Sequence, residues 1–117
     1  MIFADDEEVK DLSDVKTVGL VDFNELNPEF SSLADRVHYI IDHHVDSKLY
    51  LDTLKEEREI RLVGSAATLV IGNLMKTDAK IDSDLALFMS APLTLDSSNF
   101  NKELFNLKWT DEDVQVF

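Results

Sequence analysis

The stretch Ile40-Ile41-Asp42-His43-His44 is an apolar run that ends abruptly in a carboxylate and two adjacent imidazoles. Such a run is typical of a buried strand that carries polar side chains to the edge of a sheet. In open α/β sheets, ligands bind at the edge formed by the carboxyl ends of the strands. The chain has three histidines, and two of them stand here. The stretch therefore predicts either a metal-centred hydrolytic site or a structural pair of histidines, and the dipeptide alone does not separate the two.

The composition narrows the class of protein. The 117 residues suffice for one domain with a modest core, and a hydrophobic fraction of 44% is typical of a globular protein. A formal net charge of −13 argues against duplex nucleic acid as a partner, because that binding depends on clustered lysines and arginines. Zero cysteines exclude disulfides and thiolate metal sites. The negative charge also repels polyanionic substrates unless divalent cations accompany them.

We expect a cytoplasmic protein with no membrane partner. The longest uncharged apolar segment, 62–75, is interrupted by polar residues and is too short to span a bilayer. The chain opens without a basic, apolar, cleavable leader. A reducing compartment also agrees with the absence of cysteine.

A second strand is predicted ahead of the first stretch. The run Thr17-Val18-Gly19-Leu20-Val21 is β-branched and apolar, and Asp22 closes it. Between the strands, Asn27-Pro28 is typical of an N-cap followed by proline at the start of a short helix that ends near Ala34. This order predicts parallel pairing of the strands through a right-handed crossover. We therefore expect Asp22 and His43 at the same edge of the sheet.

Several elements are expected in the second half of the chain. We predict a loop or weak helix over 48–58, a short strand over Ile60–Val63, a buried helix from Gly64 to about Met75, and a helix over Asp82–Pro92. Ser65 is the expected N-cap of the first of these helices and Asp82 or Ser83 that of the second, and Pro92 is expected to kink or interrupt the second. Thr110 and Asp113 have the spacing of a capping box at a further helix start. Asp96 follows the apolar approach 93–95.

The acidic start of the chain, 1–14, is expected to form a solvated turn or short helix. A separate cation site at Asp5-Asp6 is an alternative that nothing else in the sequence supports.

Three residues at predicted element ends have the chemistry of a metal site. Asp22, His43 and Asp96 would supply two oxygens and one nitrogen to a divalent ion such as Mn²⁺, Mg²⁺ or Co²⁺. A carboxylate shared by two such ions can hold them about 3.5–4 Å apart, where they activate water for attack on phosphorus. His44 would then face the reacting group as a hydrogen-bond or acid partner. Asp42 would orient an imidazole.

The pattern resembles the DHH phosphoesterase superfamily, which takes its name from the residues standing here as Asp42-His43-His44. The run Leu20-Val21-Asp22-Phe23-Asn24-Glu25 resembles the superfamily's preceding metal motif. The run Gly64-Ser65-Ala66-Ala67-Thr68-Leu69-Val70 resembles its helix entry. The run Leu95-Asp96-Ser97-Ser98-Asn99-Phe100 resembles its fourth motif, and its residues are most similar to those of the exopolyphosphatase and prune branch. The four matches stand in the family's order from about Thr17 onward.

The resemblance implies a role for each site residue. It makes Asp22 the aspartate that bridges two divalent cations, His43 a metal ligand, and Asp96 a ligand of the other metal. It makes His44 the active-site histidine near the nucleophile and phosphate. The implied activity is release of orthophosphate from the end of polyphosphate, or hydrolysis of a related small phosphoanhydride.

The chain departs from the family pattern in three ways. Phe23 stands where relatives often carry a polar residue or histidine. The family's first metal motif has no counterpart before Asp22, and its C-terminal domain, which brings basic residues to the substrate, is absent. We therefore expect residues 1–117 to be a partial DHH catalytic domain with reduced or no activity. Its expected fold is α/β, with a mainly parallel sheet flanked by helices, and its uncovered sheet surface is expected to promote self-association.

Other functions remain open from the sequence. Within the superfamily, the alternatives are an inorganic pyrophosphatase and a phosphodiesterase acting on small oligonucleotides or cyclic nucleotides. Outside catalysis, the alternative is a prune-like interaction module that keeps the fold without the chemistry.

Overall fold

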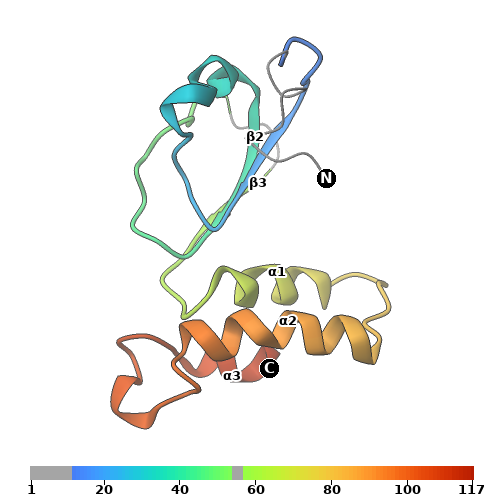
Figure 1. Cartoon of the computed structure of the whole chain (residues 1–117), viewed down its shortest axis with the longest axis vertical. Helices are drawn as coiled ribbons and strands as arrows, with labels where there is room; N and C mark the ends of the chain where they lie inside the picture. The colour runs from blue at the N-terminus through green and yellow to red at the C-terminus, as the bar shows by residue number, and fades with distance from the viewer. Residues whose placement is uncertain (1–11, 54–56) are drawn as a thin grey trace.

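The computed structural model describes residues 12–53 and 57–117, and it shows a mixed α/β fold. A three-stranded parallel sheet with strand order β1-β2-β3 is followed by helices α1, α2 and α3 (Figure 1). Two predictions concern residues that the structure does not describe, wholly or in part. Asp5-Asp6 lies outside the described residues, and so does most of the acidic start of the chain.

The predicted strand–helix–strand unit is confirmed. Strand β1 (Val18–Val21) pairs in parallel with β2 (Val37–Asp42), and the connection contains the 3₁₀-helix η2 (Pro28–Arg36). Asn27 precedes this helix as expected, but its side chain makes no capping hydrogen bond; its carbonyl accepts from the Phe30 amide at 2.9 Å instead. The connection therefore contains a helix where one was predicted, but this helix is tighter and ends at Arg36, not near Ala34.

The core of the sheet is small and fully apolar. Leu20, Val37 and Ile40 are at most 1% exposed. Neighbouring residues of intermediate burial pack around this cluster: Val18, Leu26, Tyr50 and Ile60. Ile40 of the opening stretch is therefore buried, as the strand prediction required, whereas Ile41 is half-buried.

The third strand lies earlier than predicted. Strand β3 is Glu57–Ile60, not Ile60–Val63, and it pairs in parallel with β2 so that Ile60 lies opposite Asp42. The Arg61 amide donates to the Asp42 carbonyl at 3.1 Å, after which the chain leaves the sheet. Because β2 ends at Asp42, pairing with it sets the end of β3 irrespective of the apolar residues that follow.

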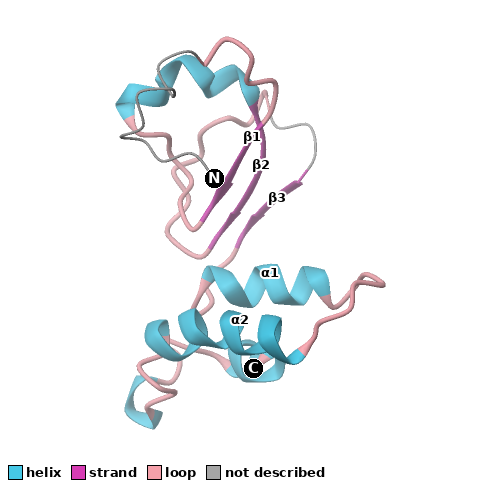
Figure 2. Cartoon of the chain, turned by 45° about the vertical axis from the view of Figure 1, so that its right-hand side comes forward, coloured by secondary structure: helices cyan, strands magenta, loops and turns pink. Residues whose placement is uncertain are grey.

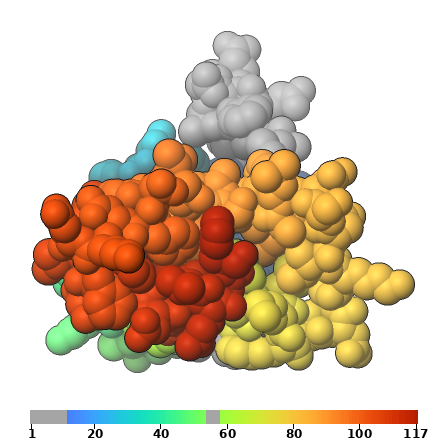
Figure 3. Space-filling view, turned by 90° about the horizontal axis from the view of Figure 1, so that it is seen from below, coloured from blue at the N-terminus to red at the C-terminus, as the bar shows by residue number. Residues whose placement is uncertain are grey.

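The helices lie beyond the carboxyl ends of the strands. In both ribbon views, α1 (Ala66–Leu74) crosses below the sheet, and α2 (Ser83–Asp96) and α3 (Asp111–Val116) lie on its far side (Figures 1 and 2). Helix α1 contacts β2, α2 and α3. Seen from below, the helical half of the chain, residues 66–117 (yellow to red), forms most of the visible surface (Figure 3). The expectation that these helices flank the sheet is therefore wrong, since they stack against its end.

The predicted caps at Ser65 and Asp82 are confirmed, but the predicted end of the second of these helices is not. The Ser65 side chain accepts from the Ala67 amide at 3.2 Å, and the Asp82 side chain accepts from the Leu85 amide at 2.9 Å. Helix α2 continues through Pro92 to Asp96, so the helix does not end at Pro92 as the sequence range 82–92 predicted. Proline removes one helix donor, but the remaining groups of the last turn still bond, as the Ser97 amide does to the Leu93 carbonyl at 3.1 Å.

None of the described helices has both the length and the apolar character that crossing a bilayer requires.

Candidate metal centre

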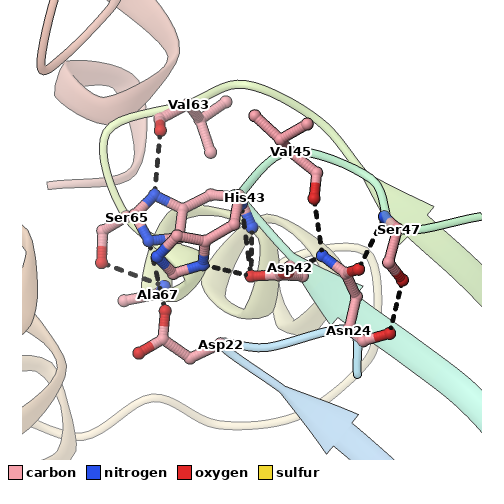
Figure 4. Close-up of polar contacts among 10 residues, drawn as sticks. Asp22, Asn24, Asp42, His43, Val45, Ser47, Val63, Ser65 and Ala67 are labelled. Carbon is pink, nitrogen blue, oxygen red and sulfur yellow. Dashed lines mark hydrogen bonds and ion pairs between the residues drawn. The ribbon is translucent and has the colours of Figure 1, made fainter.

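The centre of the candidate site lies where β1 and β2 end. Val21 pairs with Ile41, and the Asp22 amide donates to the Ile41 carbonyl at 3.0 Å. The next side chains therefore emerge together, and Asp22 Oδ1 lies 3.2 Å from His43 Nε2 (Figure 4). Asp22 has a φ of 70°, a left-handed conformation that aspartate adopts more readily than most residues. The structure thus brings together the first two predicted ligands.

The other nitrogen of His43 sets its tautomer. His43 Nδ1 lies 3.1 Å from the carbonyl oxygen of Val63, in the loop between β3 and α1. A carbonyl only accepts, so Nδ1 carries the proton and donates it. The lone pair of Nε2 then faces the carboxylate of Asp22, and a proton or a cation between the two atoms is needed to make that contact favourable. Metal-binding histidines commonly donate their other ring N–H to a carbonyl in this way.

His44 belongs to the same cluster. One ligand atom each from Asp22, His43 and His44 lie within 4.8 Å of one another. His44 Nδ1 lies 2.8 Å from Asp42 Oδ1, while its side chain is 59% exposed. Because the ionised carboxylate only accepts, Nδ1 donates and Nε2 is left for a ligand or substrate. The sequence predicted the position of His44 at this edge but not its closeness to both Asp22 and His43.

Asp42 is a fully buried carboxylate that organises both histidines. Its Oδ1 accepts from the His43 amide at 2.8 Å and the His44 amide at 3.3 Å, besides the imidazole of His44. Burial alone would raise the pKa of Asp42, but hydrogen bonds from His44 and Asn24 outweigh it and lower the pKa below its usual value. The hydrogen bond to Asp42 in turn raises the pKa of His44, with smaller contributions from the charges of Asp22 and Asp96.

Asn24 is a part of the site that residue-by-residue reasoning did not single out. Its side chain is 6% exposed, donates to Asp42 Oδ2, and donates to the Val45 carbonyl at 3.1 Å. Its Oδ1 accepts from the Ser47 amide at 2.9 Å. Asn24 therefore ties the loop after β2 to the loop after β1 (Figure 4). Its place two residues after Asp22, inside the motif already quoted, was the available signal.

Asp96 is placed apart from the cluster. It is exposed at the last residue of α2 and is not among the three clustered groups found within the described residues. It does line a cavity of about 270 Å³ together with Asp22, and a second of about 510 Å³ together with His43. The helical half therefore presents Asp96 toward the strand ends, across open space.

Comparison with known proteins assigns no family: no protein-family model matches the chain, and no curated protein matches it significantly.

Proposed function

We propose that this chain is a metal-dependent phosphoanhydride hydrolase of the DHH phosphoesterase superfamily, releasing orthophosphate from the end of polyphosphate. The observation that carries the proposal is the 3.2 Å approach of Asp22 Oδ1 to His43 Nε2 at the ends of adjacent parallel strands. The order of the sequence motifs around these residues supports the superfamily. Within the superfamily, the residues of the motif around Asp96 favour the exopolyphosphatase activity.

The donor set fits a divalent cation. Asp22 offers carboxylate oxygen and His43 offers the Nε2 lone pair, a combination suited to Mn²⁺, Co²⁺ or Mg²⁺. Two such cations, with Asp96 holding the second, are the cofactors that we propose. When bound, they would neutralise phosphate charge and lower the pKa of a water nucleophile. Three protein donors are few for such ions, so we expect an affinity in the millimolar range or weaker.

His44 is proposed as the proton donor in hydrolysis. Its raised pKa keeps a proton on the imidazole to higher pH, and Asp42 fixes the ring through Nδ1. A water oxygen, having released one proton to solvent, forms the new bond to the terminal phosphorus while the bridging P–O bond breaks. The leaving phosphate keeps the electron pair of that bond and takes a proton from His44 Nε2. Asn24 and Asp42 hold the imidazole in place for this transfer.

A second candidate function is a non-catalytic interaction module. The exposed apolar side chains of α2 favour it, because Leu87, Phe88 and Leu95 are 74–79% exposed. Such surface is often used for protein partners.

The test combines thermal unfolding in Mn²⁺ with phosphate release from polyphosphate. We expect millimolar Mn²⁺ to raise the melting temperature of the wild type and of Asp52→Asn, a control at an exposed aspartate outside the cluster. Asp22→Asn and His43→Gln should lose the shift. His44→Gln should keep the shift and lose any phosphate release.

Each result points to one part of the proposal. An equal Mn²⁺ shift in wild type and Asp22→Asn would contradict the metal centre. Loss of the shift in His44→Gln would make His44 a ligand instead of the proton donor. Stabilisation without phosphate release by the wild type would support the metal centre and agree with the reduced or absent activity expected from the sequence, whereas neither response would favour the interaction module.

A further inference from the structure

The larger of the two cavities that Asp96 lines extends away from the strand ends. It has a volume of about 510 Å³, within the range of small-molecule sites. His43 and Asp96 stand on its wall nearest the candidate metal centre. The turn 106–109, with Asn106, Lys108 and Trp109, provides further wall. The cavity therefore joins the proposed metal ligands to a segment that they do not contact directly.

This turn is held firmly against the start of α1. A Cβ added at Gly64 would lie 2.7 Å from the carbonyl oxygen of Lys108, so the absence of a side chain at Gly64 permits the approach. The Asn106 amide donates to the Trp109 carbonyl at 2.7 Å, and Trp109 Nε1 donates to the Asn101 carbonyl at 2.8 Å. The base of the Lys108 side chain thus has a fixed place on the cavity wall.

Aromatic packing also holds the same turn. The ring of Trp109 lies 4.8 Å from that of Phe105 and 5.6 Å from that of Phe100, in tilted and edge-to-face arrangements. Such pairs stabilise a defined arrangement beyond simple burial. The backbone that carries Lys108 on the cavity wall is therefore held in place by packing within the fold.

The charge of Lys108 suits an anion in this cavity. In residues 12–53 and 57–117, Lys108 takes part in none of the ion pairs that join other basic groups to carboxylates. The chain carries a net charge of −13, so a polyanionic ligand gains from every cation near its path. The side-chain amide of Asn106 adds a hydrogen-bond donor on the same wall.

We infer that this cavity binds the phosphoryl group next to the one being cleaved, with the Lys108 ammonium pairing its charge. The inference rests on the proposed hydrolase function and adds the place of the leaving group. The ligand class is a phosphoanhydride with at least two phosphoryl groups. Orthophosphate, with one group, has no part that reaches Lys108.

Trp109 offers a direct measurement, because it is the single tryptophan of the chain and lines the cavity. The probe is methylenediphosphonate, whose P–C–P bridge cannot be hydrolysed, titrated in millimolar Mg²⁺ and followed by tryptophan fluorescence. We compare wild type with Lys108→Gln and with the matched control Lys80→Gln, an exposed lysine in the loop before α2. Orthophosphate is titrated in parallel.

We expect the diphosphonate to change the fluorescence, and Lys108→Gln to weaken its binding about tenfold by removing one charge-assisted contact. Lys80→Gln should stay within about twofold of wild type, as should orthophosphate binding to Lys108→Gln. Thermal unfolding of both variants without ligand should match wild type, because both side chains are exposed.

The outcomes that would overturn the inference differ from those that would overturn the function. Equal diphosphonate affinities for Lys108→Gln and Lys80→Gln would overturn the role of Lys108 and leave the metal centre intact. Binding detected by calorimetry without any change of Trp109 fluorescence would place the ligand elsewhere. Binding that depends on Lys108 but not on Mg²⁺ would instead contradict the metal centre.

Discussion

The sheet half and the helical half of this molecule are stabilised in different ways. The sheet buries Leu20, Val37 and Ile40 almost completely around one apolar core. In α2, all of whose residues are described, Leu93 alone is buried, and Phe88 is 79% exposed. The sheet half thus centres on one apolar cluster, whereas the helical half combines buried apolar residues of α1 and α2, such as Leu69 and Leu93, with a few buried polar contacts.

Asp113 is the centre of those polar contacts. It is 1% exposed at the start of α3, and it accepts from both the amide and the hydroxyl of Thr110, at 2.7 and 2.9 Å. It also accepts from the Gly64 amide at 2.9 Å and from the Thr68 hydroxyl. One carboxylate therefore caps α3 and anchors the start of α1. The comparison teaches that the two halves should respond to different mutations.

The largest effect is expected in the apolar core. Ile40→Ala should lower the free energy of unfolding by about 4 kcal/mol, because it leaves a cavity at a residue with 0% exposure. Val45→Ala, at a residue 84% exposed, should change it by less than about 0.5 kcal/mol. Urea unfolding of both variants gives the comparison. Similar losses would show that the sheet core does not carry the stability of this half.

The next effect tests the polar centre of the helical half. Asp113→Asn should cost about 3 kcal/mol, since its NH₂ group would replace one accepting carboxylate oxygen and face donors from which it cannot accept. Asp111→Asn, an exposed acidic residue on the same helix, should cost about 0.5 kcal/mol through the helix dipole. Equal costs would contradict the central role of Asp113.

The same carboxylate should give the stability a pH dependence. Burial alone would raise the pKa of Asp113, but hydrogen bonds from Thr68, Gly64 and Thr110 lower it below the ordinary value of 3.8. Its contribution is therefore complete above the unfolded-state pKa and is lost as the pH falls through the lower, folded-state pKa. The stability difference between wild type and Asp113→Asn should shrink when unfolding is measured from pH 7 down to pH 3. A constant difference would refute the assignment.

A smaller effect is expected from a methyl group at the contact between α1 and the turn 106–109. Gly64→Ala should cost about 2 kcal/mol, because its Cβ would lie 2.7 Å from the Lys108 carbonyl oxygen. Gly72→Ala is the matched control inside α1, where a Cβ meets nothing within 4 Å. That control should stabilise the chain by up to about 1 kcal/mol through helix propensity. Equal signs for the two changes would mean that the turn moves away freely.

The smallest effect on stability is expected on the open face of α2. Phe88→Ser should change the free energy of unfolding by no more than about 0.5 kcal/mol, since the ring is largely exposed. It should reduce self-association, which we expect from uncovered apolar surface and which sedimentation measures directly. Monomeric wild-type protein at high concentration would contradict that expectation.

Local patterns in the sequence predicted much of the sheet and the helix starts. The apolar runs ending at Val21 and Ile41 identified β1 and β2, and their order predicted the parallel pairing. Ser65 and Asp82 identified two helix starts because a capping side chain acts within three residues of its own position. Each of these features depends on residues that lie close together in the sequence.

Such local patterns could not predict contacts between segments that are distant in the sequence. Strand β3 contains Glu57, Arg58 and Glu59, which have no apolar alternation, and only pairing with β2 makes them a strand. The close approach of Gly64 to Lys108 depends on how α3 packs. At the candidate site, sequence order placed Asp22 beside His43, because strand ends determine both positions. The separation of Asp96 from them depends on the stacking of α2, which no local pattern specifies.

The pairing of β1 with β2 also determines where residues can be inserted without separating Asp22 from His43. Asp22 and His43 meet because Val21 lies opposite Ile41, and the intervening chain only has to return to the start of β2. A residue inserted in the solvent-facing part of η2 lengthens this return and leaves the strand ends level. A residue inserted between Val37 and Ile41 would shift part of β2 by one position and turn its side chains to the opposite face. In a collection of length variants, the crossover should therefore accept insertions that the two strands reject.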